Sequence, residues 1–237
     1  MRADIKNQRS GLAFSARFRC FAAALLILAA PLCFSGCAAR EFFATLGFDT
    51  HDYDAEEIIS EYESDSEKAE EICEMVKTLT INSVEIPEFR GTKDAISHCR
   101  DSLLCYMMNT GYAKYTGNPE LLETAAEAYP HMRFSVIIPA EDFSNAAYKY
   151  FGGKEKVSNK SGNMFEYLDK IECYITAAPS QENSLTVNCI SLYETENTYR
   201  FTFNCTVGEE TGDDYFALII KRDDESCYFK YVEKAES

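Results

Sequence analysis

The spacing of apolar residues changes near residue 170, and this change restricts the folds that the chain can adopt. Before that point, apolar residues recur at intervals of three and four, which predicts amphipathic helices. After it, apolar and polar residues alternate, which predicts strands with one buried and one solvated face. The clearest alternation is in 198–207, where the apolar positions are Tyr199, Phe201, Phe203, Cys205 and Val207. Helices followed by antiparallel strands predict an α+β domain.

Four helices are expected in the first part of the domain. The first covers 55–79, with a break possible around 64–66, and the second covers 92–109. The third follows Asn118, a suitable N-cap with Pro119 in the first turn, and stops before Pro130. The fourth covers 139–151 and is closed by Gly152, where glycine can adopt a left-handed conformation.

The strands are expected at 132–138, 170–177, 185–193, 198–207, 215–222 and 227–234. Turn-rich segments between the later strands are short enough to connect neighbours antiparallel. We therefore expect one α+β domain, 55–237, with N-terminal helices packed on a curved, cone-like antiparallel sheet of four to six strands.

The C-terminal part resembles a known family in outline. A helix at 139–151 is followed by four or five strands, which looks like the cystatin-like, NTF2-like α+β cone. The closing segment YFALIIKRDDESCYFKYVE is similar to the final hairpin of such domains in bacterial lipoproteins. The resemblance covers about 100 residues and implies a cone that can hold a ligand or a partner. This fold supports enzymes, binders and scaffolds alike, so it carries no site residues across.

The N-terminus has the features of an export signal. A basic stretch precedes the uncharged run 21–34, which is shorter than the roughly 20 residues that span a membrane comfortably. The run ends in Phe34, Ser35, Gly36 and Cys37, which resembles the bacterial lipobox, although Phe34 stands where an aliphatic residue is usual. Two alternatives remain: cleavage after Ala38, or an uncleaved helix from 20 to 39.

The lipobox resemblance implies a signal peptide at 1–36, a lipidated Cys37 and a short tether to residue 54. The thiol would carry a diacylglyceryl group, and two or three acyl chains hold a protein to a membrane durably. We therefore expect a lipid-anchored protein of the bacterial cell membrane, facing outside the cytoplasm.

The charge of the domain excludes one class of partner. Beyond residue 36, 18 Lys and Arg face 38 Asp and Glu, so the domain should not bind nucleic acid. An envelope protein, a wall component or a small ligand remain as partners.

Seven cysteines follow Cys37, an odd number without any CxxC spacing. This pattern does not indicate a zinc site. Cys173, Cys189 and Cys205 share strand faces with apolar neighbours, so buried thiols are favoured over disulfides.

No motif for catalysis, metal binding or phosphate binding is present, and we expect no cofactor. The candidate pocket or contact surface is aromatic and basic, and its residues are Tyr106, Tyr112, Tyr115, Tyr150, Lys154 and Lys156. The tyrosines could instead belong to the core, and the lysines, with Lys149 and Lys160, to a solvated loop. The expected function is non-catalytic binding of a ligand or partner. The alternative is an enzyme that uses Asp, Glu or Tyr as acid and base in a cone-shaped pocket.

Overall fold

The computed structural model describes residues 51–153, 157–177 and 184–236. The predictions for the signal peptide, Cys37, most of the tether, Lys154 and Lys156 lie outside these residues. The chain divides into two compact units, Met1–Asp54 and Ala55–Ser237, and the second contains the fold described below. Within the described residues, no helix combines the length and the apolar character that a membrane span requires.

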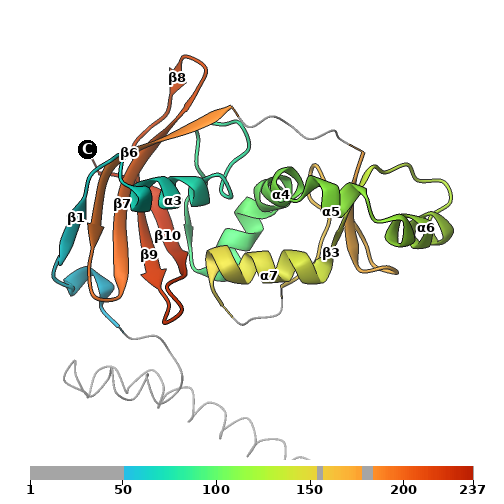
Figure 1. Cartoon of the computed structure of the whole chain (residues 1–237), viewed down its shortest axis with the longest axis horizontal. Helices are drawn as coiled ribbons and strands as arrows, with labels where there is room; N and C mark the ends of the chain where they lie inside the picture. The colour runs from blue at the N-terminus through green and yellow to red at the C-terminus, as the bar shows by residue number, and fades with distance from the viewer. Residues whose placement is uncertain (1–50, 154–156, 178–183, 237) are drawn as a thin grey trace, which may run out of the picture. The chain divides into compact units, whose positions relative to one another are not determined.

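A seven-stranded antiparallel sheet forms one side of the second unit (Figure 1). Its strand order is β1-β6-β7-β9-β10-β2, and β8 pairs with β7. The bounds are β1 Ser60–Tyr62, β2 Phe89–Arg90, β6 Leu185–Glu194, β7 Thr198–Val207, β8 Glu210–Thr211, β9 Tyr215–Lys221 and β10 Cys227–Lys234. The four long strands occur where the alternation of apolar residues predicts them.

A three-stranded sheet, in the order β3-β5-β4, forms the second layer of strands. Its bounds are β3 Val136–Pro139, β4 Glu166–Leu168 and β5 Cys173–Thr176. The sequence predicts β3 and β5 as strands, but it indicates neither β4 nor a separate sheet. The fold class α+β is therefore confirmed, with more strands than the four to six expected for one curved sheet.

The helices are α3 Glu67–Val76, α4 Thr92–Thr110, α5 Tyr112–Thr116, α6 Pro119–Ala128 and α7 Ala140–Phe151, and a short 3-10 turn, η1, covers Tyr53–Ala55. Two predicted caps are confirmed. The side chain of Asn118 accepts a hydrogen bond from the Leu121 N–H at the start of α6. Gly152 ends α7 with a φ of 68°, a left-handed conformation that favours glycine.

The helix predicted for 55–79 is wrong in its first half. Residues Ser60–Tyr62 form β1, which pairs antiparallel with the end of β6. The helix begins only after Ser66, whose Oγ accepts a hydrogen bond from the Ala69 N–H. The helical spacing of 58 and 62 was misleading because pairing with β6 satisfies the backbone there and outweighs helix propensity.

The core fills the space between the inner face of the large sheet and the helices. Phe201, Phe203, Tyr215 and Phe229 are each at most 1% exposed, and α3, α4 and α7 contribute to the same cluster. Cys173 and Cys205 are buried, and Cys189 is half-buried. The concave face that the sequence suggested for a ligand is therefore packed with side chains.

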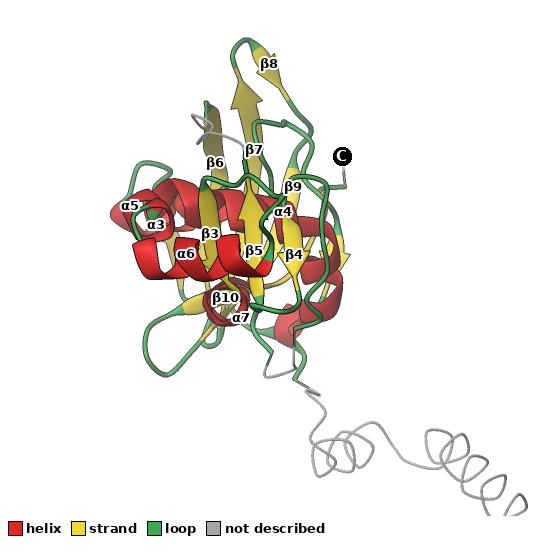
Figure 2. Ribbon diagram, turned by 90° about the vertical axis from the view of Figure 1, so that its right-hand side faces the viewer, coloured by secondary structure: helices red, strands yellow, loops and turns green. Residues whose placement is uncertain are grey.

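The small sheet has apolar residues on both faces. Val136, Ile138 and Tyr174 belong to the main core, whereas Ile137 and Ile175 belong to a second cluster with Ala125 of α6. Figure 2 shows α6 lying across the outer face of this sheet. The small sheet therefore separates the main core from a smaller one that only α6 and nearby loops cover.

Candidate functional site

A surface groove of about 350 Å³ lies between the end of α4, the short helix α5 and α7. We call it the tyrosine groove. The main residues of its wall are Tyr106, Met107, Thr110, Gly111, Lys114, Tyr115, Asp142, Asn145, Ala146, Lys149 and Tyr150. Its volume is within the range of ligand sites in proteins, roughly 300 to 1,000 Å³.

The structure brings together three of the tyrosines that the sequence singles out. Tyr106, Tyr115 and Tyr150 line the groove, whereas Tyr112 is 48% exposed and is not part of its wall. Lys154 and Lys156 are not among the described residues. Their neighbour Lys149, from the same basic stretch, does line the groove.

Two lysines lie over the aromatic rings of the groove. The ammonium of Lys149 is 4.9 Å from the ring centre of Tyr150, and that of Lys114 is 5.1 Å from the ring centre of Tyr115. Such cation–π geometry positions the ammonium groups beside the rings. The rings of Tyr106 and Tyr150 meet edge to face with their centres 5.7 Å apart. The groove therefore presents aromatic surface and positive charge together.

Lys114 and Asp142 are site residues that the sequence does not reveal. The Lys114 Nζ is 2.6 Å from Oδ2 of Asp142, which joins α5 to the first turn of α7. The two residues are 28 positions apart, and only the folded structure places them in contact. This ion pair occupies the one carboxylate of the groove wall, while Lys149 makes no ion pair with a described residue.

Two hydroxyls of the groove, those of Tyr106 and Tyr115, are protonated at neutral pH. Burial raises the pKa of Tyr106, and its hydrogen bond with Tyr150 and the nearby Glu74 raise it further. Burial, and then the charge of Asp142, also raise the pKa of Tyr115. Both phenols therefore keep their protons near pH 7, and neither is suited to act as a base there.

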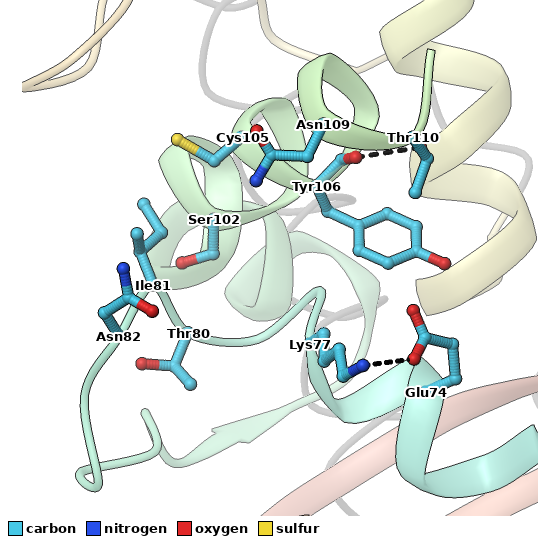
Figure 3. A pocket seen from close by; sticks show the side chains of 10 residues that line it. All are labelled: Glu74, Lys77, Thr80, Ile81, Asn82, Ser102, Cys105, Tyr106, Asn109 and Thr110. Carbon is cyan, nitrogen blue, oxygen red and sulfur yellow. Dashed lines mark hydrogen bonds and ion pairs between the residues drawn. The ribbon is translucent and has the colours of Figure 1, made fainter. Parts of the chain in front are cut away.

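A smaller, polar pocket lies on the other side of Tyr106, between α3, α4 and the segment 80–82 (Figure 3). Its volume is about 120 Å³, and its wall includes Thr80, Ser102 and Asn109. At its mouth, the Lys77 Nζ lies 2.5 Å from Oε2 of Glu74. A polar space of this size holds a few water molecules rather than an organic ligand.

A third groove, of about 500 Å³, lies between the end of α7 and the β9–β10 turn. The guanidinium of Arg222 is 4.6 Å from the ring centres of both Tyr148 and Tyr228. It also donates hydrogen bonds to the carbonyl oxygens of Tyr148 and Lys149 in the last turn of α7. Because Arg222 is fully engaged, its main role is to fix the hairpin against the helix end.

The tyrosine groove and the polar pocket have few groups that could carry out acid–base chemistry. The tyrosine groove and the polar pocket each contain one carboxylate, and a lysine neutralises each of them. No group of three or more His, Cys, Asp or Glu among the described residues is arranged to hold a metal ion. Hydrogen bonding, aromatic contact and positive charge are the chemistry that the tyrosine groove provides.

No protein-family model matches the chain, and comparison with curated proteins and with solved structures finds no match.

Proposed function

We propose that this chain is a membrane-anchored extracytoplasmic lipoprotein whose α+β domain binds a ligand or an envelope partner without catalysing a reaction. The anchor is the diacylglyceryl group on Cys37, and the contact surface is the tyrosine groove. The basic stretch, the short apolar run and the cysteine at 37 support the anchor.

The observation that carries the binding role is the position of the accessible space. The inner face of the large sheet is filled by aromatic side chains, so a ligand cannot enter there. The tyrosine groove opens at the surface, where a small molecule, a wall component or a protein segment can reach it. Open surface grooves are suited to recognition, whereas catalysis usually requires a site that excludes water.

Charge supports an anionic or hydrogen-bond-accepting ligand. The domain is strongly acidic, yet the groove wall has two lysines and one aspartate. Since Asp142 neutralises Lys114, the ammonium of Lys149 is the charge that remains for a ligand.

The alternative is an enzyme that uses acid–base chemistry. It requires a carboxylate or phenolate that is free to accept a proton near neutral pH. In the groove, Asp142 is held by Lys114, and the raised pKa values of Tyr106 and Tyr115 keep both phenols protonated. These features favour binding over catalysis at this site.

The anchor is tested by substituting Cys37→Ser in the full chain and measuring the mature protein by mass spectrometry after membrane fractionation. We expect the wild type to have a lipid-bearing N-terminal cysteine and the variant to lose both the lipid and stable membrane retention. Cys33→Ser is the matched control and should behave as the wild type. A lipid-bearing mature N-terminus that persists in Cys37→Ser contradicts the anchor.

The groove is tested by Lys149→Glu, with Lys93→Glu as a control of equal charge at an exposed position on α4. The full-length proteins are cross-linked in the native envelope, and the retained components are identified by mass spectrometry. We expect components that the wild type and Lys93→Glu retain equally and that Lys149→Glu loses by about tenfold, the effect of removing a charge-assisted contact. Equal retention by all three proteins excludes the groove as the contact surface.

A further inference from the structure

Two cysteines lie close together on the inner face of the large sheet. In the pairing of β6 with β7, Val187 is opposite Cys205 and Cys189 is opposite Phe203. Paired residues point to the same face, and so do Phe203 and Cys205, which are two positions apart. Cys189 and Cys205 are therefore diagonal neighbours on one face, a relation that places Cα atoms roughly 7 to 8 Å apart.

A third cysteine approaches from the helix that covers these strands. Ala69, Ile72, Cys73 and Val76 of α3 follow the i, i+3, i+4, i+7 spacing of one helix face, and the first, second and fourth are fully buried. This face packs on β6, as Figure 1 shows for α3 in front of the sheet. Cys73 therefore points toward the strand that carries Cys189.

The electrostatic environment of the three thiols agrees with this placement. Burial raises the pKa of Cys73 to about 12, and the nearby Cys189 is the next largest cause. Burial also raises the pKa of Cys205 to about 12, with Cys73 as the second cause. Cys73 is therefore within electrostatic range of both strand cysteines.

Exposure distinguishes the two strand cysteines. Cys73 and Cys189 are half-buried, whereas Cys205 is fully buried, so Cys205 is the least accessible of the three to a reagent from solvent. Other thiols have different sulfur neighbours: Cys105 lies 4.0 Å from the thioether of Met164, and Cys227 lies 3.5 Å from that of Met75. A thioether cannot form a disulfide with a thiol.

We propose that Cys73 and Cys189 form a site of covalent modification, a reversible disulfide that links α3 to β6. The co-reactant is a small disulfide of the glutathione class. One cysteine thiolate attacks that disulfide, forms a mixed disulfide and releases one small thiol. The second cysteine then attacks the mixed disulfide, which forms the Cys73–Cys189 bond and releases the second small thiol. The protein loses two hydrogen atoms in total, and the small disulfide is reduced to two thiols.

This exchange should be slow near neutral pH and faster in alkali. Only the thiolate attacks, and the pKa of Cys73 is far above 7. Below that pKa the thiolate fraction rises about tenfold for each pH unit, so the rate of disulfide formation should rise by about the same factor. If unfolding exposed the thiol, its pKa would be near 8.5, and the rate of disulfide formation would stop rising above about pH 9.

The test uses the folded full chain, treated with oxidised glutathione at several pH values and then alkylated. Trypsin with a Glu-specific protease separates Cys73, Cys173, Cys189 and Cys205 into different peptides, because Glu182 lies between Cys173 and Cys189. We expect a linked Cys73–Cys189 peptide that disappears on reduction and forms about tenfold faster for each added pH unit. Cys205 should stay a free thiol and should react with the alkylating reagent only after denaturation.

Substitutions of single cysteines test which thiols form the bond. Cys73→Ala and Cys189→Ala should each abolish the linked peptide and leave the partner cysteine free for alkylation, whereas Cys173→Ala should leave the linked peptide unchanged. A bond from Cys73 to Cys205, a linked peptide that appears only in denaturant, or two separately alkylated peptides after prolonged oxidation would each overturn the assignment.

Discussion

Removal of the Glu56 carboxylate should weaken the domain measurably. Glu56 lies just after the boundary of the second unit and binds the turn between β6 and β7. Its carboxylate accepts a hydrogen bond from the Thr195 hydroxyl. It also accepts two from Asn197, one from the side-chain amide at 2.7 Å and one from the backbone N–H at 3.3 Å. The hydroxyl of Thr198 is 3.5 Å away. Thr195 and Thr198 are both fully buried.

The cost of Glu56→Ala follows from these contacts. A hydrogen bond to a charged group contributes about 1.5 to 3 kcal/mol, and a buried donor that loses its acceptor adds a desolvation penalty. The Thr195 hydroxyl has another acceptor, the carbonyl oxygen of Thr198 at 3.2 Å, which offsets part of the loss. Asn197 can turn its amide toward water. We therefore expect Glu56→Ala to lower the free energy of unfolding by about 2 to 3 kcal/mol.

The measurement is urea denaturation of the full chain, followed by circular dichroism. Glu57→Ala is the matched control, because Glu57 is exposed and adjacent, and it should change the free energy of unfolding by less than about 0.5 kcal/mol. Thermal unfolding should show the same order, with Glu56→Ala lowering Tm by about 5 to 10 °C. If both variants unfold at the same urea concentration, the Glu56 carboxylate does not stabilise the turn.

Two further predictions concern α7 and the edge of the large sheet. Gly152→Ala should lower the free energy of unfolding by about 2 to 4 kcal/mol, because φ is 68° and the new Cβ would lie 2.3 Å from the Tyr228 ring. The control Gly208→Ala has a φ of 63° but open space around the new Cβ, and it should lower the free energy of unfolding by only about 1 kcal/mol. Equal losses in urea denaturation would exclude the clash with Tyr228. Tyr62 has its pKa raised from 10.0 to about 12, first by its hydrogen bond to Glu194 and then by burial. Because this pKa is higher in the folded state, the stabilisation from the Tyr62 hydroxyl is complete below pH 10 and is lost as the pH rises toward 12. The difference in free energy of unfolding between the wild type and Tyr62→Phe should therefore shrink between pH 10 and 12 and stay constant below pH 10.

Local sequence patterns predict much of this fold because several elements carry complete signals. The helix α4 and the four long strands occur where apolar periodicity places them, since each has enough residues to establish a period. The caps at Asn118 and Gly152 are predictable because the chemistry that ends a helix is local.

The remaining elements depend on pairing between distant segments. The three residues of β1 are strand only because β6 offers them an edge, and β4 is similarly short beside β5. Neither is long enough to show a period of two. The helical spacing around Tyr62 then predicts the wrong element, because tertiary pairing outweighs the local pattern.

The candidate site shows the same division. An aromatic, basic surface is visible in the composition of α4 and α7, and three of the tyrosines do meet in one groove. The pairing of Lys114 with Asp142 requires α5 to lie beside α7, which no local pattern encodes. Tyr112 and Tyr115 have the i, i+3 spacing of one helix face, yet Tyr112 is 48% exposed and is not part of the groove wall, so helical spacing alone does not predict its position.

The small sheet gives α6 a degree of independence from the rest of the domain. Ala125 is the one fully buried residue of this helix, and the cluster beneath it is separated from the main core by β3 and β5. Few apolar contacts resist its detachment, so α6 can open by local fluctuation while the large sheet stays closed. Its amide hydrogens should exchange with solvent sooner than those of β7, so this corner of the domain should sample open states more often than the large sheet.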